Sequence, residues 1–201
     1  MKREIRIPVQ KRSIEKRNKI IDAALQIFNE KGYFNTNTAE IAKRAELATG
    51  SLYSYFKDKK DIFLEVSNLY GHTIYNHSVK ELSKIEDTND LDLMIKTTIN
   101  IILESHKIYS KFHQEMMTLC YIDNEVKYQV REQQKLLLNK YIEKFKNLNF
   151  KNSKEEYFLL YSLIEDTCHE IIYNEKSDLD REDLIEVCVA LIKKILLLNV
   201  V

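Results

Sequence analysis

The apolar positions in the first 60 residues recur at helical spacing in three short groups. The first group runs from Ser13, a suitable N-cap, to Gly32, a residue typical of a helix end, and contains Ile20, Ile21, Ala24, Leu25 and Phe28. Thr36 or Thr38 can cap a second helix, and a third is predicted over about residues 49–56. Three closely spaced helices are therefore expected at the start of the chain.

Longer amphipathic segments follow these three helices. Asp58 can cap a long fourth helix, and polar or acidic breaks separate five more, which we expect at about residues 90–107, 109–121, 124–147, 154–174 and 181–198. The chain has only 3 Gly and 1 Pro among 201 residues, so the tight turns of an antiparallel sheet are largely missing. The pattern predicts an all-α fold of about nine helices.

Residues 38–56 have the pattern of a helix-turn-helix. Its two helices are too short to be stable alone, and a tight turn is predicted at Glu46 and Leu47. The inward-facing positions are Ile41, Ala42, Ala45, Leu47 and Leu52. The preceding helix, predicted before Gly32, packs against these two helices and completes the core of a three-helix unit. Such units place the N-terminal end of their last helix in the major groove, where small and polar residues allow close approach. Here that end is formed by Thr49, Gly50 and Ser51, which predicts binding of double-stranded DNA.

Charge is distributed unevenly, although the net charge is zero. Residues 1–60 contain 14 Lys and Arg against 7 Asp and Glu, whereas the remainder contains 17 against 24. A basic N-terminal part favours binding of a polyanionic partner, and the acidic remainder of the chain repels one. We expect a flexible basic arm over residues 1–12, a helix-turn-helix DNA-binding domain over 13–58, and a helical effector-binding and dimerisation domain over 59–201.

Three further residues are candidates for contacts with the DNA backbone. The hydroxyls of Tyr53 and Tyr55 and the ammonium of Lys59 can reach phosphate oxygens, and such contacts position a protein on DNA without reading its sequence. For Tyr53 alone, packing within the helix explains the residue equally well.

The residues around the helix-turn-helix resemble the signature of the TetR family of transcriptional regulators. The resemblance covers residues 16–66 and includes the stretch GYFNTNTAEIAKRAELATGSLYSYFKDKKDIF; its matching positions are Gly32, Thr36, Ile41, Ala42, Gly50, Leu52, Tyr53, Tyr55, Phe56, Lys59 and Ile62. It implies a sequence-specific DNA-binding regulator, acting as a repressor, whose DNA-facing residues are Thr38, Thr49, Gly50, Ser51, Tyr53, Tyr55 and Lys59. Of these, Thr49 and Ser51 are the expected base readers.

Two positions depart from that signature. Glu46 stands where the family usually has a turn glycine, and a left-handed conformation costs a residue with a side chain about 1 kcal/mol. Ala48 stands in place of a helix-capping serine, so we expect capping to shift to Thr49.

The resemblance also implies a homodimer and a small-molecule effector. The dimer would form through helices at about 154–174 and 181–198, which are apolar around much of their circumference, and would present two recognition helices to a pseudo-palindromic operator. A small hydrophobic effector of unknown identity would bind inside the body and release the repressor; side chains suited to its pocket are Phe112, Met116, Met117, Cys120, Tyr121, Tyr128 and Tyr161. Ordinary core packing explains these side chains equally well. A regulator without an effector, or a helical scaffold, stays open as an alternative.

Neither an enzyme, a cofactor nor a metal site is expected. The GxGxxG, P-loop, GxSxG and HExxH motifs are absent from the sequence. Cys120, Cys168 and Cys188 are widely spaced, as in reduced core cysteines of a cytosolic protein. The five histidines lack a flanking carboxylate or cysteine that completes a recognised ligand set, and the ionisable residues around His169 are expected to point in different directions. Because no apolar stretch approaches the roughly 18 residues of a membrane span, we expect a cytoplasmic protein without a membrane partner.

Overall fold

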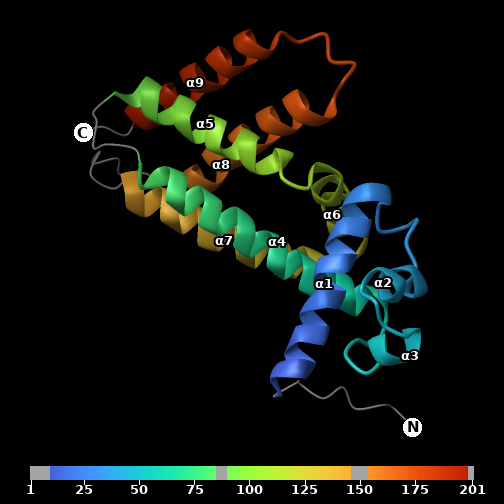
Figure 1. Cartoon of the computed structure of the whole chain (residues 1–201). Helices are drawn as coiled ribbons and strands as arrows, with labels where there is room; N and C mark the ends of the chain where they lie inside the picture. Colours follow the sequence, from blue (N-terminus) through green and yellow to red (C-terminus); the bar gives the residue numbers. More distant parts are fainter. Residues whose placement is uncertain (1–9, 85–89, 146–153, 199–201) are drawn as a thin grey trace. The chain divides into compact units, whose positions relative to one another are not determined.

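The computed structural model describes residues 10–84, 90–145 and 154–198, and every regular element within these ranges is a helix (Figure 1). The predicted all-α class is confirmed. Residue contacts divide the chain into two compact units. The N-terminal unit comprises Met1–His72 and Tyr109–Val130, and the C-terminal unit comprises Thr73–Ile108 and Arg131–Val201.

Six of the described helices contribute to the N-terminal unit. They are α1 (Lys11–Lys31), α2 (Thr38–Arg44), α3 (Thr49–Leu52), the first part of α4 (Lys59–Leu82), α6 (Ser110–Ile122) and the first part of α7 (Asn124–Phe145). Phe28 of α1, Phe63 of α4 and Phe112 of α6 are buried, with ring centroids between 5.2 and 6.3 Å apart. The compact unit around the helix-turn-helix therefore extends beyond the predicted boundary after residue 58, because α6 completes its aromatic core.

Gly32 ends α1 with a backbone conformation that requires glycine. Its φ of 90° lies in a region that L side chains rarely adopt, and a Cβ atom at this position would overlap the carboxylate of Glu115 on α6. The same carboxylate accepts a hydrogen bond from the backbone N–H of Tyr33. The missing side chain of Gly32 thus allows α6 to dock against the end of α1.

The first helix begins three residues earlier than predicted, because its N-cap is residue 10 and not residue 13. α1 starts at Lys11 with Gln10 as its N-cap, so Lys11 and Arg12 belong to the helix and not to a flexible arm. Ser13, the predicted N-cap, is already inside the helix. Residues 1–9 of the predicted arm lie outside the described part of the chain.

The second helix is capped by Asn37 and not by either predicted threonine. The Asn37 side chain accepts from the backbone N–H of Glu40 at 3.0 Å, and the Glu40 carboxylate accepts from the Asn37 N–H at 3.1 Å. This reciprocal capping box has a visible spacing in the sequence, with the acidic residue three positions after the cap. Thr36 is instead buried and donates to the carbonyl of Gly32 at 2.7 Å, whereas Thr38 is the first residue of α2.

The C-terminal unit is built from α5 (Leu91–Lys107), α8 (Lys154–Tyr173) and α9 (Arg181–Leu198), with the remaining parts of α4 and α7. The bounds of α5 to α9 lie within one or two residues of the predicted ranges, and residues 146–147 of the predicted seventh helix are outside the described residues. α5 packs against α8 and α9, which also pack on each other. Cys168 and Cys188 are buried in this core, as predicted, and burial raises the pKa of both thiols. None of the helices in the described ranges is long and apolar enough to cross a membrane.

Candidate nucleic-acid interface

The turn between α2 and α3 closes α2 with a Schellman motif. The backbone N–H of Glu46 donates to the carbonyl of Lys43 at 3.1 Å, and that of Leu47 donates to the carbonyl of Ala42 at 2.9 Å. Glu46 has a φ of 58°, which confirms the left-handed turn predicted at this residue. The two hydrogen bonds offset a conformational cost of about 1 kcal/mol.

α3 is a single helical turn, shorter than the predicted helix over residues 49–56. The N–H groups of Tyr55 and Phe56 donate to the carbonyl of Leu52, which continues the helical curl by one further turn. The N-cap is Ala48, whose methyl group accepts no hydrogen bond, and Thr49 is the first helical residue. The predicted shift of capping to Thr49 is therefore wrong. Burial of Leu52 and Phe56 holds the turn in place instead.

The tip of α3 consists of Thr49, Gly50 and Ser51, the three residues predicted to enter the major groove. Gly50 is exposed, and its two neighbours are half-buried. A Cβ atom added to Gly50 would meet no other atom within 4 Å, and this glycine has no positive φ. Unlike Gly32, Gly50 is not required by the fold of the protein.

Two tyrosine hydroxyls beside this tip are held by other hydroxyl groups. The Tyr53 hydroxyl lies 2.9 Å from Oγ1 of Thr38 at the start of α2, and Oγ of Ser13 on α1 donates to the Tyr55 hydroxyl at 3.2 Å. A hydroxyl pair shares one hydrogen and retains a second for another acceptor. Both pairs therefore orient a donor, which is exposed at Tyr53 and partly buried at Tyr55. Ser13 was not predicted to take part, because its partner is 42 residues away in the sequence.

Lys59, predicted to contact phosphate, is bound within the protein. Its ammonium donates to the backbone carbonyls of Tyr33 and Thr36 at 2.7 and 2.8 Å and lies 4.2 Å from the centroid of the Tyr33 ring. Burial lowers the pKa of Lys59, and the nearby charge of Glu115 acts in the opposite direction. The side chain thus fastens the start of α4 to the loop between α1 and α2, which is a positioning role that the sequence did not reveal.

A Lys59→Met variant is expected to lower the free energy of unfolding by about 2 kcal/mol, because two backbone carbonyls lose a charged donor. Urea denaturation measures this difference. Lys57→Met is the matched control, since Lys57 is exposed two residues away. If the two variants have equal free energies of unfolding and only Lys59→Met loses affinity for DNA, then Lys59 binds phosphate and does not stabilise the fold.

Several cations of the N-terminal unit are paired with carboxylates. Arg44 contacts Glu30 through two hydrogen bonds of 2.5 and 2.8 Å and lowers the pKa of that carboxyl group. Other pairs are Arg17 with Glu65 at 2.6 Å and Lys60 with Asp123 at 2.6 Å, and the ammonium of Lys60 lowers the pKa of Asp123. These pairs reduce the positive charge available for DNA. Lys11, Arg12, Lys43 and Lys57 remain exposed.

The seven residues predicted to line an effector pocket are not brought together. Phe112 and Met116 are buried in the N-terminal unit, and Met117 and Cys120 on the same helix are partly buried. Tyr121 and Tyr128 are largely exposed. Tyr161 alone of the seven lines a cavity found in the C-terminal unit.

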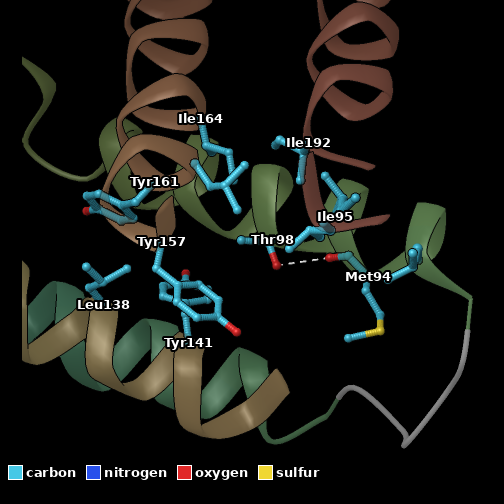
Figure 2. A pocket seen from close by; sticks show the side chains of 12 residues that line it. Met94, Ile95, Thr98, Leu138, Tyr141, Tyr157, Tyr161, Ile164 and Ile192 are labelled. Atoms are coloured by element: carbon cyan, nitrogen blue, oxygen red, sulfur yellow. Dashed lines mark hydrogen bonds between the residues drawn. The ribbon is translucent and has the colours of Figure 1, made fainter. Parts of the chain in front are cut away.

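That cavity lies between the side chains of α5, α7, α8 and α9 and has a volume of about 90 Å³ (Figure 2). Its wall is almost entirely apolar and aromatic, with residues that include Met94, Ile95, Leu138, Tyr157, Tyr161 and Ile164. Thr98 also faces it, but its hydroxyl donates to the Met94 carbonyl at 2.9 Å. The lining positions of each helix follow helical spacing, yet the sequence does not show which facing helices leave a void.

Comparisons with known proteins agree with this geometry. Residues 20–66 match the family described as bacterial regulatory proteins, tetR family. The transcriptional regulator QacR of Staphylococcus aureus (strain Mu50) is 30% identical over 129 residues, which are 64% of this chain and 66% of QacR. HbdR of Aromatoleum sp. (strain CIB) is 46% identical over 56 residues, which are 27% of this chain and 24% of HbdR.

A solved TetR-family regulator from Mesorhizobium loti shares the fold, with a TM-score of 0.68 at 20% identity over 96% of this chain and 100% of that one. The chain spans between 24 and 66% of the length of the first curated relatives. The helix-turn-helix signature, its geometry and the shared fold lead to one conclusion: this chain belongs to the TetR family of bacterial transcriptional regulators.

Proposed function

We propose that this protein is a transcriptional repressor that binds a pseudo-palindromic operator as a homodimer and is released by a small hydrophobic effector. The open tip of α3 carries the DNA-binding part of this proposal. Gly50 is exposed and has room for a side chain, yet lies between two hydroxyl-bearing residues, Thr49 and Ser51. Since the fold does not require glycine there, close approach of the backbone to base edges accounts for it.

Contacts with the sugar-phosphate backbone of the DNA would come from the residues around the tip of α3. The oriented hydroxyls of Tyr53 and Tyr55 supply hydrogen-bond donors, and the exposed ammonium groups of Lys43 and Lys57 supply charge. In this arrangement Lys59 does not contact DNA but holds the start of α4 against the loop between α1 and α2, and Thr38 orients the hydroxyl of Tyr53.

Duplex binding at a series of salt concentrations tests the proposal. A preferred sequence is first selected from a random duplex pool, and affinity is then measured by fluorescence anisotropy for it and for an unrelated duplex. The logarithm of the binding constant is expected to fall linearly with the logarithm of the salt concentration. Absent or salt-independent binding by the folded protein contradicts the proposal.

A Tyr55→Phe variant is expected to bind both duplexes about 5- to 10-fold more weakly, because one phosphate hydrogen bond of about 1 kcal/mol is lost without regard to sequence. Ser13→Ala is the matched control, since it removes the same internal hydrogen bond and keeps the tyrosine hydroxyl. Equal losses of DNA affinity in the two variants would show that the Tyr55 hydroxyl stabilises the fold and does not contact DNA.

Exposed apolar residues support the dimer. Phe158 and Leu159 on α8 and Val187 and Leu191 on α9 are all more than 40% exposed, on the two helices predicted to form the interface. Two-fold pairing through these helices would cover them and would place two recognition tips against one duplex.

The cavity in the C-terminal unit is the proposed effector site. Its wall suits an apolar ligand, but its 90 Å³ is smaller than the roughly 150 Å³ engineered cavity that accommodates benzene. An effector of ordinary drug size must therefore widen it. The small volume also favours the second candidate, a regulator that has no effector.

Native mass spectrometry of the purified protein separates these two candidates. A co-purified apolar compound, lost when Ile164→Trp fills the cavity, supports the effector. A dimer that binds its operator, carries no ligand and is released by none of a panel of apolar compounds supports a regulator without one.

A further inference from the structure

Two histidines and a glutamate converge inside the C-terminal unit. Nε2 of His106 on α5 lies 3.0 Å from Nε2 of His169 and 3.0 Å from Oε2 of Glu165, both on α8. The distance from His169 Nε2 to the same carboxylate oxygen is 3.6 Å. His106 is only 5% exposed, so one oxygen and two ring nitrogens meet at a largely buried point.

The sequence conceals this group because its members come from two helices. Glu165 and His169 are four residues apart on α8, a spacing that puts them on one helical face, contrary to the expectation that they point in different directions. His106 is 63 residues from His169 and reaches it only through the packing of α5 on α8.

The three distances match those between ligands of a tetrahedral metal ion. Zinc binds histidine nitrogen and carboxylate oxygen at about 2.0 to 2.2 Å, and tetrahedral angles then separate neighbouring ligand atoms by about 3.3 to 3.5 Å. The observed separations of 3.0, 3.0 and 3.6 Å require only small movements to reach that spacing.

The orientation of His106 adds a second indication. Its Nδ1 lies 2.8 Å from the backbone carbonyl of Ile102, so Nδ1 carries a hydrogen in that bond. In neutral His106 the Nε2 lone pair then faces the Glu165 oxygen and the other imidazole, so either a hydrogen on one of the facing groups or a bound metal ion lies between them. A donor bond from the distal ring nitrogen to a carbonyl is also how metal-ligating histidines are commonly held.

We infer that His106, Glu165 and His169 form a binding site for a divalent transition-metal ion of the zinc type. Two imidazoles and one carboxylate suit zinc, cobalt, nickel or iron and suit calcium or magnesium poorly. Three protein ligands leave at least one coordination position for water or another group. A bound ion would link α5 to α8. The inference does not depend on DNA binding, because the metal is measured without DNA.

Titration of the untagged, metal-free protein with Co²⁺ and Zn²⁺ tests the site. Binding of one ion per chain is expected, with visible Co²⁺ absorption bands of tetrahedral intensity and with Zn²⁺ competing for the same site. Glu165→Gln and His169→Gln are expected to weaken Zn²⁺ binding at least about 100-fold, since even the loss of an outer-shell partner costs 10- to 100-fold. His72→Gln, at an exposed histidine of α4, is the control and should bind as the unaltered protein does.

A second measurement covers variants that fold poorly. Zn²⁺ is expected to raise the Tm of the unaltered protein relative to chelator, and to leave the Tm of Glu165→Gln unchanged. Lack of stoichiometric binding by the unaltered protein, or equal affinities in Glu165→Gln and His72→Gln, would overturn the inference and assign the group to a protonated hydrogen-bond network.

Discussion

A Val187→Asp/Leu191→Asp double variant is expected to be monomeric and to lose operator binding. The two side chains are 56 and 46% exposed and lie four residues apart on one face of α9. An interface that covers them would bury two unpaired carboxylates from each copy, each costing at least about 2 kcal/mol, and two-fold symmetry doubles every loss. The dimer dissociation constant should rise by at least about 10⁴-fold.

Sedimentation velocity measures the change in assembly, and anisotropy measures the loss of operator affinity. Circular dichroism should stay unchanged, because both positions are exposed within the chain and a charge there leaves the core intact. Asn100→Asp adds one charge at an exposed position of α5 and is the matched control. A double variant that stays dimeric would place the interface elsewhere on the molecule.

A Gly50→Leu variant is expected to bind its operator on the order of 100-fold more weakly while folding at least as stably as the unaltered protein. The side chain enters open space in the free protein, and leucine favours a helix over glycine by up to about 1 kcal/mol. At a groove, the same side chain would hold the backbone of α3 away from the base edges. Stability and affinity should therefore change in opposite directions.

Urea denaturation and anisotropy on the same samples provide the two measurements. Asn100→Leu controls for an added exposed leucine in the C-terminal unit. Gly50→Ala should give a smaller loss of affinity with the same gain in stability. Unchanged operator affinity in Gly50→Leu would remove the tip of α3 from the interface.

Local features of the candidate interface were predictable because their causes lie within a few residues. The left-handed turn at Glu46 follows from the short spacing between α2 and α3, and its two hydrogen bonds reach only three and five residues back. The capping box at Asn37 and Glu40 is equally local, and its spacing is visible in the sequence, although the cap was predicted at Thr36 or Thr38. The exposed tip at Gly50 follows from the same short segment.

Roles that depend on distant partners were not predictable in the same way. Lys59 looks like a free cation in the sequence, but the loop between α1 and α2 brings two carbonyls to it from 23 and 26 residues away. The predicted effector wall concentrated on α6, yet the cavity lies in the C-terminal unit. A void depends on how well facing side chains fill the space between helices, and periodicity carries no information on that fit.

The order of residues by itself determined the helices, their approximate ends and the helix-turn-helix signature, because apolar period, capping and turn chemistry act over one or two helical turns. Tertiary structure alone decided that Gly32 admits Glu115, that Lys59 is tied to backbone carbonyls, and that His106 meets Glu165 and His169. The reason is physical: contacts between helices depend on which faces pack together and at what register, and side chains far apart in the chain meet only after that choice is made.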